Sequence, residues 1–510
     1  MSTEDTSLYA AREPIFPRRV SGAFRRLKWQ IMAVTLAIYY VTPWLRWDRG
    51  PALPDQAVLV DLAHRRFYFF WIEIWPHEFY FVAGLLIMAG VGLFLFTAAL
   101  GRVWCGYACP QTVWTDLFLL VERWVEGDRN ARLRLHRAPW SARKWRLRLS
   151  KWALWLAIAL ATGGAWVFYF ADAPGLARDL LTLEAPPVAW ASIGVLTFTT
   201  FTFGGFMREQ VCIYMCPWPR IQGAMMDDGT LTVAYRDWRG EPRGRGLKRQ
   251  ATPATRAAGP RIGGRSPLLP MPNRDGATRA AAAHDTPPEA PAGDCIDCNA
   301  CVNVCPMGID IRDGQQMACI TCALCIDACD EVMARIDRPR GLIDYLALED
   351  APREAAGGAP RPAWQHVLRA RNLVYFALWL ACGLALIAAL MLRPTLELTV
   401  APVRNPSFIT LSDGSIRNAY DLRLRNREGV PSAIALSLSD PGALALEVEG
   451  AEPGAVAIRA DSQRLIRVYV TAPPGAPAAS ADRSALSIEA RDVETGATAR
   501  VATTFNGDAP

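Results

Sequence analysis

The sequence predicts a multi-domain integral membrane protein, because three different patterns follow one another along its 510 residues. Five apolar stretches lie between residues 29 and 392, and basic residues are concentrated beside some of them. A short segment holds eight of the thirteen cysteines, and the C-terminal part alternates apolar with polar residues. Apolar residues make up 51% of the chain, yet its mean hydropathy is only +0.10, which fits membrane spans diluted by polar domains.

The five apolar stretches approach the roughly 20 residues that a helix needs to cross a bilayer. They cover residues 29–45, 79–100, 152–170, 188–206 and 373–392. Buried helices of a soluble protein are the alternative, but uncharged stretches of this length favour transmembrane helices. A basic segment precedes the first stretch and no small-residue cleavage site follows it, so we expect an uncleaved anchor.

Lysine and arginine residues beside the spans predict the orientation of the chain, because cytoplasmic loops are enriched in them. Basic residues cluster before the first span and after the second: Arg12, Arg18, Arg19, Arg25, Arg26 and Lys28, then Arg129, Arg132, Arg134, Arg137, Arg143, Lys144, Arg146, Arg148 and Lys151. The loop after the third span contains one basic residue, Arg178. We therefore expect a multi-pass protein of the bacterial inner membrane, with a cytoplasmic N-terminus and cysteine-rich segment and a periplasmic C-terminal part. Lipid and topology explain the net charge of +6, so no nucleic acid partner is expected.

The eight clustered cysteines form two quartets with the same spacing, C-x-x-C-x-x-C-x-x-x-C. This is the bacterial ferredoxin pattern, in which three thiolates hold one 4Fe-4S cluster and the fourth binds the other cluster. The pattern predicts the following ligand sets: Cys295, Cys298, Cys301 and Cys329 for the first cluster, and Cys319, Cys322, Cys325 and Cys305 for the second. Zinc sites and disulfides are the alternatives, but a duplicated spacing favours the clusters. A chain with two such clusters carries electrons.

Four further cysteines form two matching C-x-x-x-C-P pairs, which follow the second and fourth spans on the expected cytoplasmic side. The pairs are Cys105 with Cys109, and Cys212 with Cys216. Proline disfavours helical geometry at the residue before it, so each pair should mark a helix end or kink. Soft thiolates select Cu(I), zinc or iron–sulfur centres, which makes these four sulfurs a candidate copper site. Packing as small buried side chains is the alternative, and it is favoured for Cys382, which stands alone in the last span.

The C-terminal part alternates apolar and polar residues in seven segments bounded by Gly, Pro and Asp. The segments cover residues 396–400, 419–426, 434–439, 444–449, 455–460, 464–472 and 485–492. This pattern predicts an immunoglobulin-like β-sandwich. It contains neither Cys nor His, so we expect no metal chemistry there. The full expected organisation is a tail 1–28, a four-helix transmembrane region 29–235, a linker 236–292, a ferredoxin domain 293–345, a linker 346–372, a fifth transmembrane helix 373–392 and the β-sandwich 393–510.

Several sequence blocks together resemble the cytochrome c oxidase accessory proteins of the FixG/CcoG family, membrane polyferredoxins linked to assembly of cbb3-type oxidases. The blocks are GRVWCGYACPQTVWTD, CIYMCPWPRIQGAMMDDGTLTVAY, GEPRG, CALCIDACDEVM and RPRGLI. The resemblance implies a cupric reductase that supplies Cu(I) to the oxidase. It also implies two classes of partner: a copper-exporting P-type ATPase and oxidase assembly factors.

Three hypotheses about function follow. In the first, an unidentified cytoplasmic or quinol donor reduces the clusters, which reduce Cu(II) held near the C-x-x-x-C-P pairs. In the second, the chain relays electrons from quinol, as related membrane subunits with paired C-x-x-x-C-P motifs do. In the third, it is a non-enzymatic assembly scaffold with structural clusters.

Overall fold

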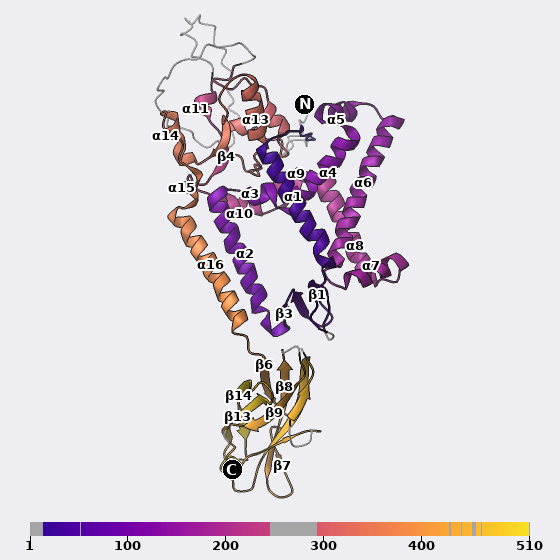
Figure 1. Cartoon of the computed structure of the whole chain (residues 1–510), viewed down its shortest axis with the longest axis vertical. Coiled ribbons are helices and arrows are strands. Elements are labelled where there is room, and N and C mark those ends of the chain that lie inside the picture. Colours follow the sequence, from indigo (N-terminus) through magenta and orange to yellow (C-terminus); the bar gives the residue numbers. More distant parts are fainter. Residues whose placement is uncertain are drawn as a thin grey trace, which may run out of the picture. The chain divides into compact units, whose positions relative to one another are not determined.

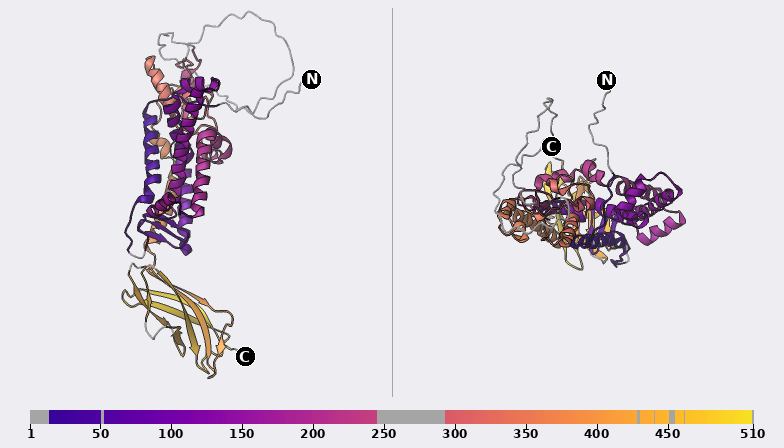
Figure 2. Two further views of the ribbon diagram at one scale, coloured as in Figure 1. Left: turned by 90° about the vertical axis from the view of Figure 1, so that its right-hand side faces the viewer. Right: turned by 90° about the horizontal axis from the view of Figure 1, so that it is seen from above.

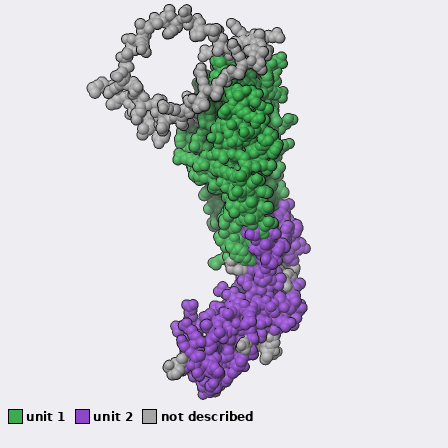
Figure 3. All heavy atoms as spheres, turned by 90° about the vertical axis from the view of Figure 1, so that its left-hand side faces the viewer, with its two compact units in different colours: residues 1–44, 58–67, 74–384 green, residues 45–57, 68–73, 385–510 purple. Residues whose placement is uncertain are grey.

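The computed structural model describes residues 14–50, 53–244, 293–427, 430–439, 441–450, 455–460 and 462–508. The chain forms two compact units, coloured green and purple in Figure 3. The first comprises residues 1–44, 58–67 and 74–384, and the second comprises residues 45–57, 68–73 and 385–510. Much of the expected N-terminal tail (residues 1–13) and of the expected linker (residues 245–292) lies outside the described residues.

A helix forms at each of the five expected spans: α1 Ala23–Val41, α2 Tyr80–Leu100, α6 Ala142–Val167, α8 Pro187–Thr200 and α16 Ala370–Met391 (Figure 1). Within the described parts of the chain, three helices are long and apolar enough to cross a membrane: α2, α16 and the continuous stretch Pro187–Met215. Helices α1 and α6 begin with several charged residues, so their apolar parts are shorter. Five spans therefore remain a prediction.

The stretch that begins with α8 does not keep regular α-helical winding. It continues as a π-helical segment Phe201–Met207, then α9 Arg208–Gln210, then a second π-helical segment Val211–Met215. π-Helical turns are rare in proteins, but those that do occur are often found at functional sites. Here they lead directly into the second cysteine pair.

Shorter helices lie between the long ones: α3 Val103–Tyr107, α4 Pro110–Glu126, α5 Arg129–Arg137, α7 Ala173–Thr182, α10 Trp218–Met225 and α11 Asp237–Gly240. Helix α4 is amphipathic and buries charged side chains as well as apolar ones. Its Glu122 is 2% exposed and pairs with cations from three other helices: Arg132 on α5, Lys151 on α6 and Arg208 on α9. These ion pairs join four helices, of which α9 is the most distant from α4 in the sequence.

The cysteine-rich segment is held by a two-stranded antiparallel sheet of β4 Thr232–Tyr235 and β5 Ile343–Leu346. All four residues of β4 are buried. In the sequence between the two strands, the chain forms α12 Ala300–Val304 and α13 Leu324–Arg335. Residues 346–372, expected as a linker, contain α14 Ala351–Ala355 and α15 Ala363–Val367. Arg236 bonds Glu354 at 2.7 Å, so part of this segment packs on the module.

The second unit contains the predicted β-sandwich, seen from two further sides in Figure 2. One sheet has the order β10-β12-β8-β6, with β7 paired to β8, and the other has the order β11-β9-β13-β14. The strands are β6 Leu396–Pro402, β7 Ile409–Thr410, β8 Ile416–Asn426, β9 Ser432–Leu438, β10 Ala445–Val448, β11 Ala455–Ile458, β12 Ser462–Ala472, β13 Arg483–Asp492 and β14 Thr498–Asn506. All seven expected strands form.

Strands β7 and β14 were not predicted. Another unpredicted element is a three-stranded sheet after α1, built from β1 Val58–Asp61, β2 Arg66–Phe69 and β3 Ile72–Ile74. The core of the sandwich includes Tyr420, Leu424, Ile434 and Phe505, each at most 1% exposed. Apolar residues of both sheets thus make a core independent of any metal.

Candidate metal centres

Each cysteine quartet lies on a loop that turns back on itself and then enters a short helix. Four residues between the cysteines have positive φ angles: Asp297 (52°) and Asn299 (55°) in the first quartet, and Thr321 (55°) and Ala323 (58°) in the second. These are equivalent positions in the two repeats. Left-handed backbone is unfavourable for Thr and Ala, and strain of this kind persists where the surroundings impose it. The duplicated spacing thus corresponds to a duplicated backbone shape.

Four cysteines expected to share the first cluster lie near one another. Cys295, Cys301 and Cys329 belong to one buried cluster of side chains, and Cys298 is exposed. Burial and, to a smaller extent, the nearby sulfurs of Cys301, Cys298 and Cys295 together raise the pKa of Cys329 to about 12. The fourth cysteine of the second quartet therefore lies among the first three of the first quartet.

The reciprocal arrangement holds for the other four cysteines. Cys305, Cys319, Cys322 and Cys325 line a cavity of about 20 Å³, together with Cys301 and apolar neighbours that include Ile320. Burial and, to a smaller extent, the nearby Cys322 and Cys319 together raise the pKa of Cys305 to about 12. The backbone N–H groups of residues 307 and 309 donate hydrogen bonds to the Cys305 sulfur and act in the opposite direction.

This donor set fits iron–sulfur clusters. Eight free thiols lie close together, seven of them buried or partly buried and Cys298 exposed, and backbone N–H groups already point at sulfur. Hydrogen bonds to sulfur and low solvent exposure are features of protein-bound iron–sulfur clusters. Because burial raises the thiol pKa, metal binding has to displace protons from these cysteines.

The two C-x-x-x-C-P motifs have the same local geometry. In the first, Cys105 lies on α3, and Cys109 is extended (ψ 129°) immediately before α4 begins at Pro110. In the second, Cys212 lies on the π-helical segment, and Cys216 is extended (ψ 124°) before Pro217. Each motif therefore ends one helix and starts another, as the proline positions predict.

The four sulfurs of these motifs lie together. Burial and, to a smaller extent, the nearby Cys109, Cys212 and Cys216 together raise the pKa of Cys105 to about 12. The Cys105 thiol donates a hydrogen bond to Gln222 Oε1 at 3.1 Å. Cys105 and Cys212 pack against the same buried cluster of side chains that includes Cys322, with Cys305 at its edge. One thiol-rich region thus joins the motifs to the second ferredoxin quartet.

The first motif touches the loop of the second quartet through backbone and side chains. A Cβ on Gly106 would lie 2.6 Å from the Ile320 carbonyl oxygen, so only glycine allows this approach. The Tyr107 hydroxyl donates to the Cys322 carbonyl at 3.2 Å. Arg102 donates to the carbonyls of Met317 and, at 3.2 Å, Cys319. Residues 102–107 therefore hold the loop 317–322 directly.

Sequence reasoning missed these positioning residues. Arg102, Gly106 and Tyr107 are inside the block GRVWCGYACP, but no spacing rule indicates that they contact a loop more than two hundred positions away. His366 is a buried histidine. It is 2% exposed, and its Nε2 lies 2.8 Å from the buried carboxylate of Asp350. Glu349 stands nearby, but Arg361 pairs with both carboxylates.

Comparison with protein families identifies three matching regions. A model described as a 4Fe-4S dicluster domain matches residues 207–259 and 270–347, and a second, described as a 4Fe-4S binding domain, matches residues 81–132. A third, described as the IG-like fold at the C-terminal of FixG, putative oxidoreductase, matches residues 386–508. The protein is thus an iron–sulfur protein of the 4Fe-4S type with an immunoglobulin-like C-terminal domain.

Three relatives match nearly the whole chain. Protein RdxB of Cereibacter sphaeroides is 61% identical over 99% of this chain and 98% of its own length, and Protein RdxA of the same organism is 60% identical over 98% of both. Nitrogen fixation protein FixG of Rhizobium meliloti is 52% identical over 92% of this chain and 88% of its own length. On this identity, and on the matching C-terminal domain, the chain belongs to the FixG/RdxA family.

Proposed function

We propose that this protein reduces Cu(II) to Cu(I) at the four sulfurs of its C-x-x-x-C-P motifs. The electrons would come from the two 4Fe-4S clusters. The observation that carries the proposal is the direct contact between Gly106, beside Cys105, and the loop of the second ferredoxin quartet. A thiol-rich site and an electron carrier that share one wall can exchange electrons without a soluble intermediary.

We assign the first cluster to Cys295, Cys298, Cys301 and Cys329, and the second to Cys319, Cys322, Cys325 and Cys305. When bound, each cluster supplies reversible one-electron oxidation and reduction. The support for the crossed assignment is the position of Cys329 among the first three cysteines and the cavity shared by Cys305 and the second quartet. The backbone N–H groups that face Cys305 stabilise negative charge on its sulfur.

Copper is the substrate in this proposal, and the thiols select its reduced state. Cys105, Cys109, Cys212 and Cys216 offer soft sulfur ligands, which favour Cu(I) over Cu(II). Cu(II) accepts one electron and no atom is transferred, so the products are Cu(I) and the oxidised electron carrier. Gln222 bonds the Cys105 thiol and positions it for the ion. Reduction at a site that prefers the product makes the transfer more favourable.

The proposed setting is the bacterial inner membrane, with five spans. The N-terminus and clusters would face the cytoplasm, and the C-terminal domain the periplasm. The three long apolar helices and the basic segments beside the expected spans support this topology. In this setting the Cu(I) serves assembly of a cbb3-type oxidase, with a copper-exporting ATPase and assembly factors as partners. The family resemblance supports these partners.

A double substitution tests the copper site. Cys109→Ser with Cys216→Ser should abolish Cu(II) reduction and leave the iron content and visible spectrum unchanged, because neither residue belongs to a proposed cluster. Cys382→Ser is the matched control, since its thiol lies on α16 and only approaches the Gly84 carbonyl at 3.7 Å. If the double variant reduces Cu(II) at the wild-type rate, the copper role of these pairs is wrong.

A further inference from the structure

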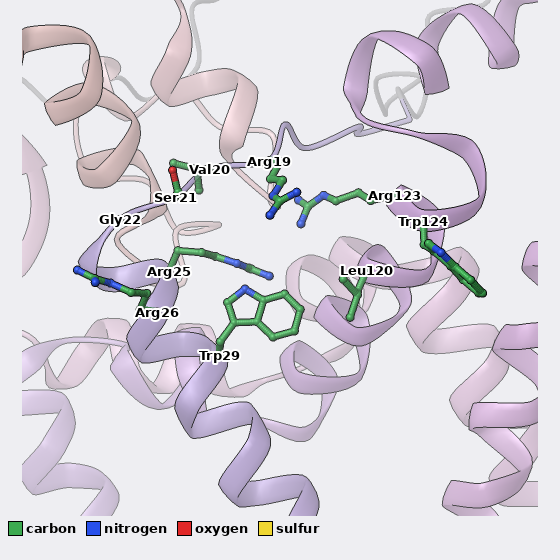
Figure 4. A pocket seen from close by; sticks show the side chains of 10 residues that line it. All are labelled: Arg19, Val20, Ser21, Gly22, Arg25, Arg26, Trp29, Leu120, Arg123 and Trp124. Carbon is green, nitrogen blue, oxygen red and sulfur yellow. The ribbon is translucent and has the colours of Figure 1, made fainter. Parts of the chain in front are cut away.

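A basic pocket lies where the N-terminal segment meets α1 and α4. It has a volume of about 830 Å³, and its lining includes Arg19, Arg25, Arg26 and Arg123 together with Trp29 and Trp124. Figure 4 shows the guanidinium ends of Arg19, Arg25 and Arg123 directed into the same space, next to the Trp29 ring. Neither the iron–sulfur sites nor the copper proposal uses these side chains.

The most buried of these cations has donor capacity left over. Arg25 is 5% exposed, and its Nη1 donates to Asp116 at 2.9 Å, but its Nη2 is buried and has no hydrogen-bond partner among the described residues. Its guanidinium lies 4.6 Å from the centre of the Trp29 ring. An unsatisfied buried cationic donor is costly, so a ligand with acceptor oxygens would stabilise it.

The charge around the pocket also favours an anion. The buried Nε of Arg123 has no partner within the described part of the chain. Burial lowers the pKa of Arg123, and the like charge of Arg25 lowers it further. Three carboxylates lie close by: Asp116 pairs with Arg25, Asp128 accepts from the Arg19 backbone N–H at 3.0 Å, and Asp327 accepts from the Arg25 backbone N–H at 2.7 Å. The lining itself carries four arginines and no carboxylate. Positive charge is therefore left in excess.

The apolar part of the lining distinguishes a lipid from a small soluble anion. Trp124 is 78% exposed and Leu120 is 37% exposed, and both border the pocket. Tryptophan is enriched at the membrane–water interface, where its ring lies at headgroup depth. Basic pockets on the cytoplasmic side of membrane helices bind anionic lipid headgroups.

We propose that this pocket binds the phosphodiester headgroup of an anionic phospholipid. Arg19, Arg25 and Arg123 donate to the phosphate oxygens, and Trp29 and Trp124 contact the upper part of the lipid. The assignment rests on the proposed topology, which puts the start of α1 at the cytoplasmic surface of the membrane. Acidic proteins could also meet a basic surface, but a concave pocket with aromatic walls fits a headgroup better than a protein surface.

Lipid binding by the full-length protein tests the site. The protein is purified without oxygen, stripped of lipid in a neutral detergent, and examined by native mass spectrometry with phosphatidylglycerol, cardiolipin or phosphatidylcholine. Arg19→Gln with Arg123→Gln should weaken binding of the two anionic lipids about tenfold or more, since each interfacial cation contributes on the order of 1 kcal/mol. Binding of phosphatidylcholine should be weak and unchanged.

The matched control is Arg143→Gln with Arg146→Gln, which removes the same charge from exposed side chains at the start of α6. Equal loss in the control and pocket variants, or equal binding of phosphatidylglycerol and phosphatidylcholine, would overturn the proposal. Inorganic phosphate provides a further arm: if it raises the melting temperature as much as phosphatidylglycerol does, the site takes a small anion and the lipid assignment is wrong. Iron content and Cu(II) reduction are measured in parallel, so failure here is distinguishable from failure of the copper proposal.

Discussion

At the scale of single residues, Gly106 determines whether the first cysteine pair can lie against the second ferredoxin loop. Its position allows contact with the backbone of residues 320–322, and any side chain would meet a carbonyl oxygen at 2.6 Å. The contact involves backbone on both sides, so a side-chain rotation cannot relieve the clash. The distance between the second ferredoxin quartet and the proposed copper site therefore depends on the absence of a Cβ at residue 106.

Gly106→Ala tests this dependence. Overpacking of this kind costs about 1–3 kcal/mol, and we expect the two loops to separate and Cu(II) reduction to slow while iron content is retained. Gly164→Ala is the control, because a Cβ on Gly164 of α6 meets no atom within 4 Å. The rate of Cu(II) reduction per iron is the measurement. Equal rates in both variants would show that the close approach is unnecessary.

Paired substitutions test the crossed ligand sets. Cys295→Ser with Cys329→Ser should remove one cluster and leave about four irons per chain, because both residues serve the same cluster. Cys295→Ser with Cys305→Ser should disturb both clusters. Iron analysis and EPR of the reduced proteins distinguish the two outcomes. If the second pair leaves one intact cluster and the first pair none, each quartet binds its own cluster.

At the scale of elements, the buried ion pairs of Glu122 hold four helices together. Burial opposes ionisation of Glu122, but Arg208, Arg132 and Lys151 outweigh it and lower its pKa from 4.5 to about 2. A carboxyl with a depressed pKa stabilises the fold above its unfolded pKa. This stabilisation is present above about pH 4.5 and is lost as the pH falls towards 2.

Glu122→Gln should lower the free energy of unfolding by about 3–5 kcal/mol, because it leaves buried cations without their anion. The measurement is a thermal melt in detergent at neutral pH. The control is Glu447→Gln, which breaks the ion pair between Glu447 and Arg417. The Glu447 side chain is 62% exposed, so this substitution should have little effect. A loss at Glu122 as small as at Glu447 would contradict the role of these ion pairs.

Elements differ in how far the sequence predicted them. The β-strands of the second unit follow from period-two alternation, which is a local signal, and all seven expected strands form. Helix α4 was not expected. Its buried face includes the charged residues Asp116, Glu122 and Glu126, and in a sequence such residues indicate an exposed polar segment. No sequence rule predicts the π-helical segments Phe201–Met207 and Val211–Met215 either. Tertiary packing decides both features.

At the scale of the whole molecule, the sequence predicted which cysteines form sets but not how the sets meet. Spacing within a motif reports local geometry, so the two quartets and the two C-x-x-x-C-P pairs were recognisable from the sequence. The strand pair β4–β5 brings residues 232–235 beside residues 343–346. Hydrogen bonds from Arg102 and Tyr107 add contacts to the loop 317–322. These contacts join segments distant in sequence, and no periodicity encodes them.

The same contacts give the protein its proposed order of electron flow. The loop of the second quartet contacts the first C-x-x-x-C-P motif at Gly106, and Cys301 lies close enough to Cys325 to raise the pKa of the Cys325 thiol. The two cluster sites and the thiol site therefore form a continuous series within the first unit. The β-sandwich has its own core and contributes no cysteine to this series.

The most direct test is EPR of the anaerobically purified, reduced protein before and after addition of Cu(II). About eight irons per chain and signals from two interacting 4Fe-4S clusters are expected before addition. Added Cu(II), up to about two equivalents per chain, should abolish the cluster signals and itself give no cupric signal, because each of the two reduced clusters holds one electron and each electron produces one Cu(I). A cupric signal that persists beside fully reduced clusters would contradict electron transfer from the clusters to copper.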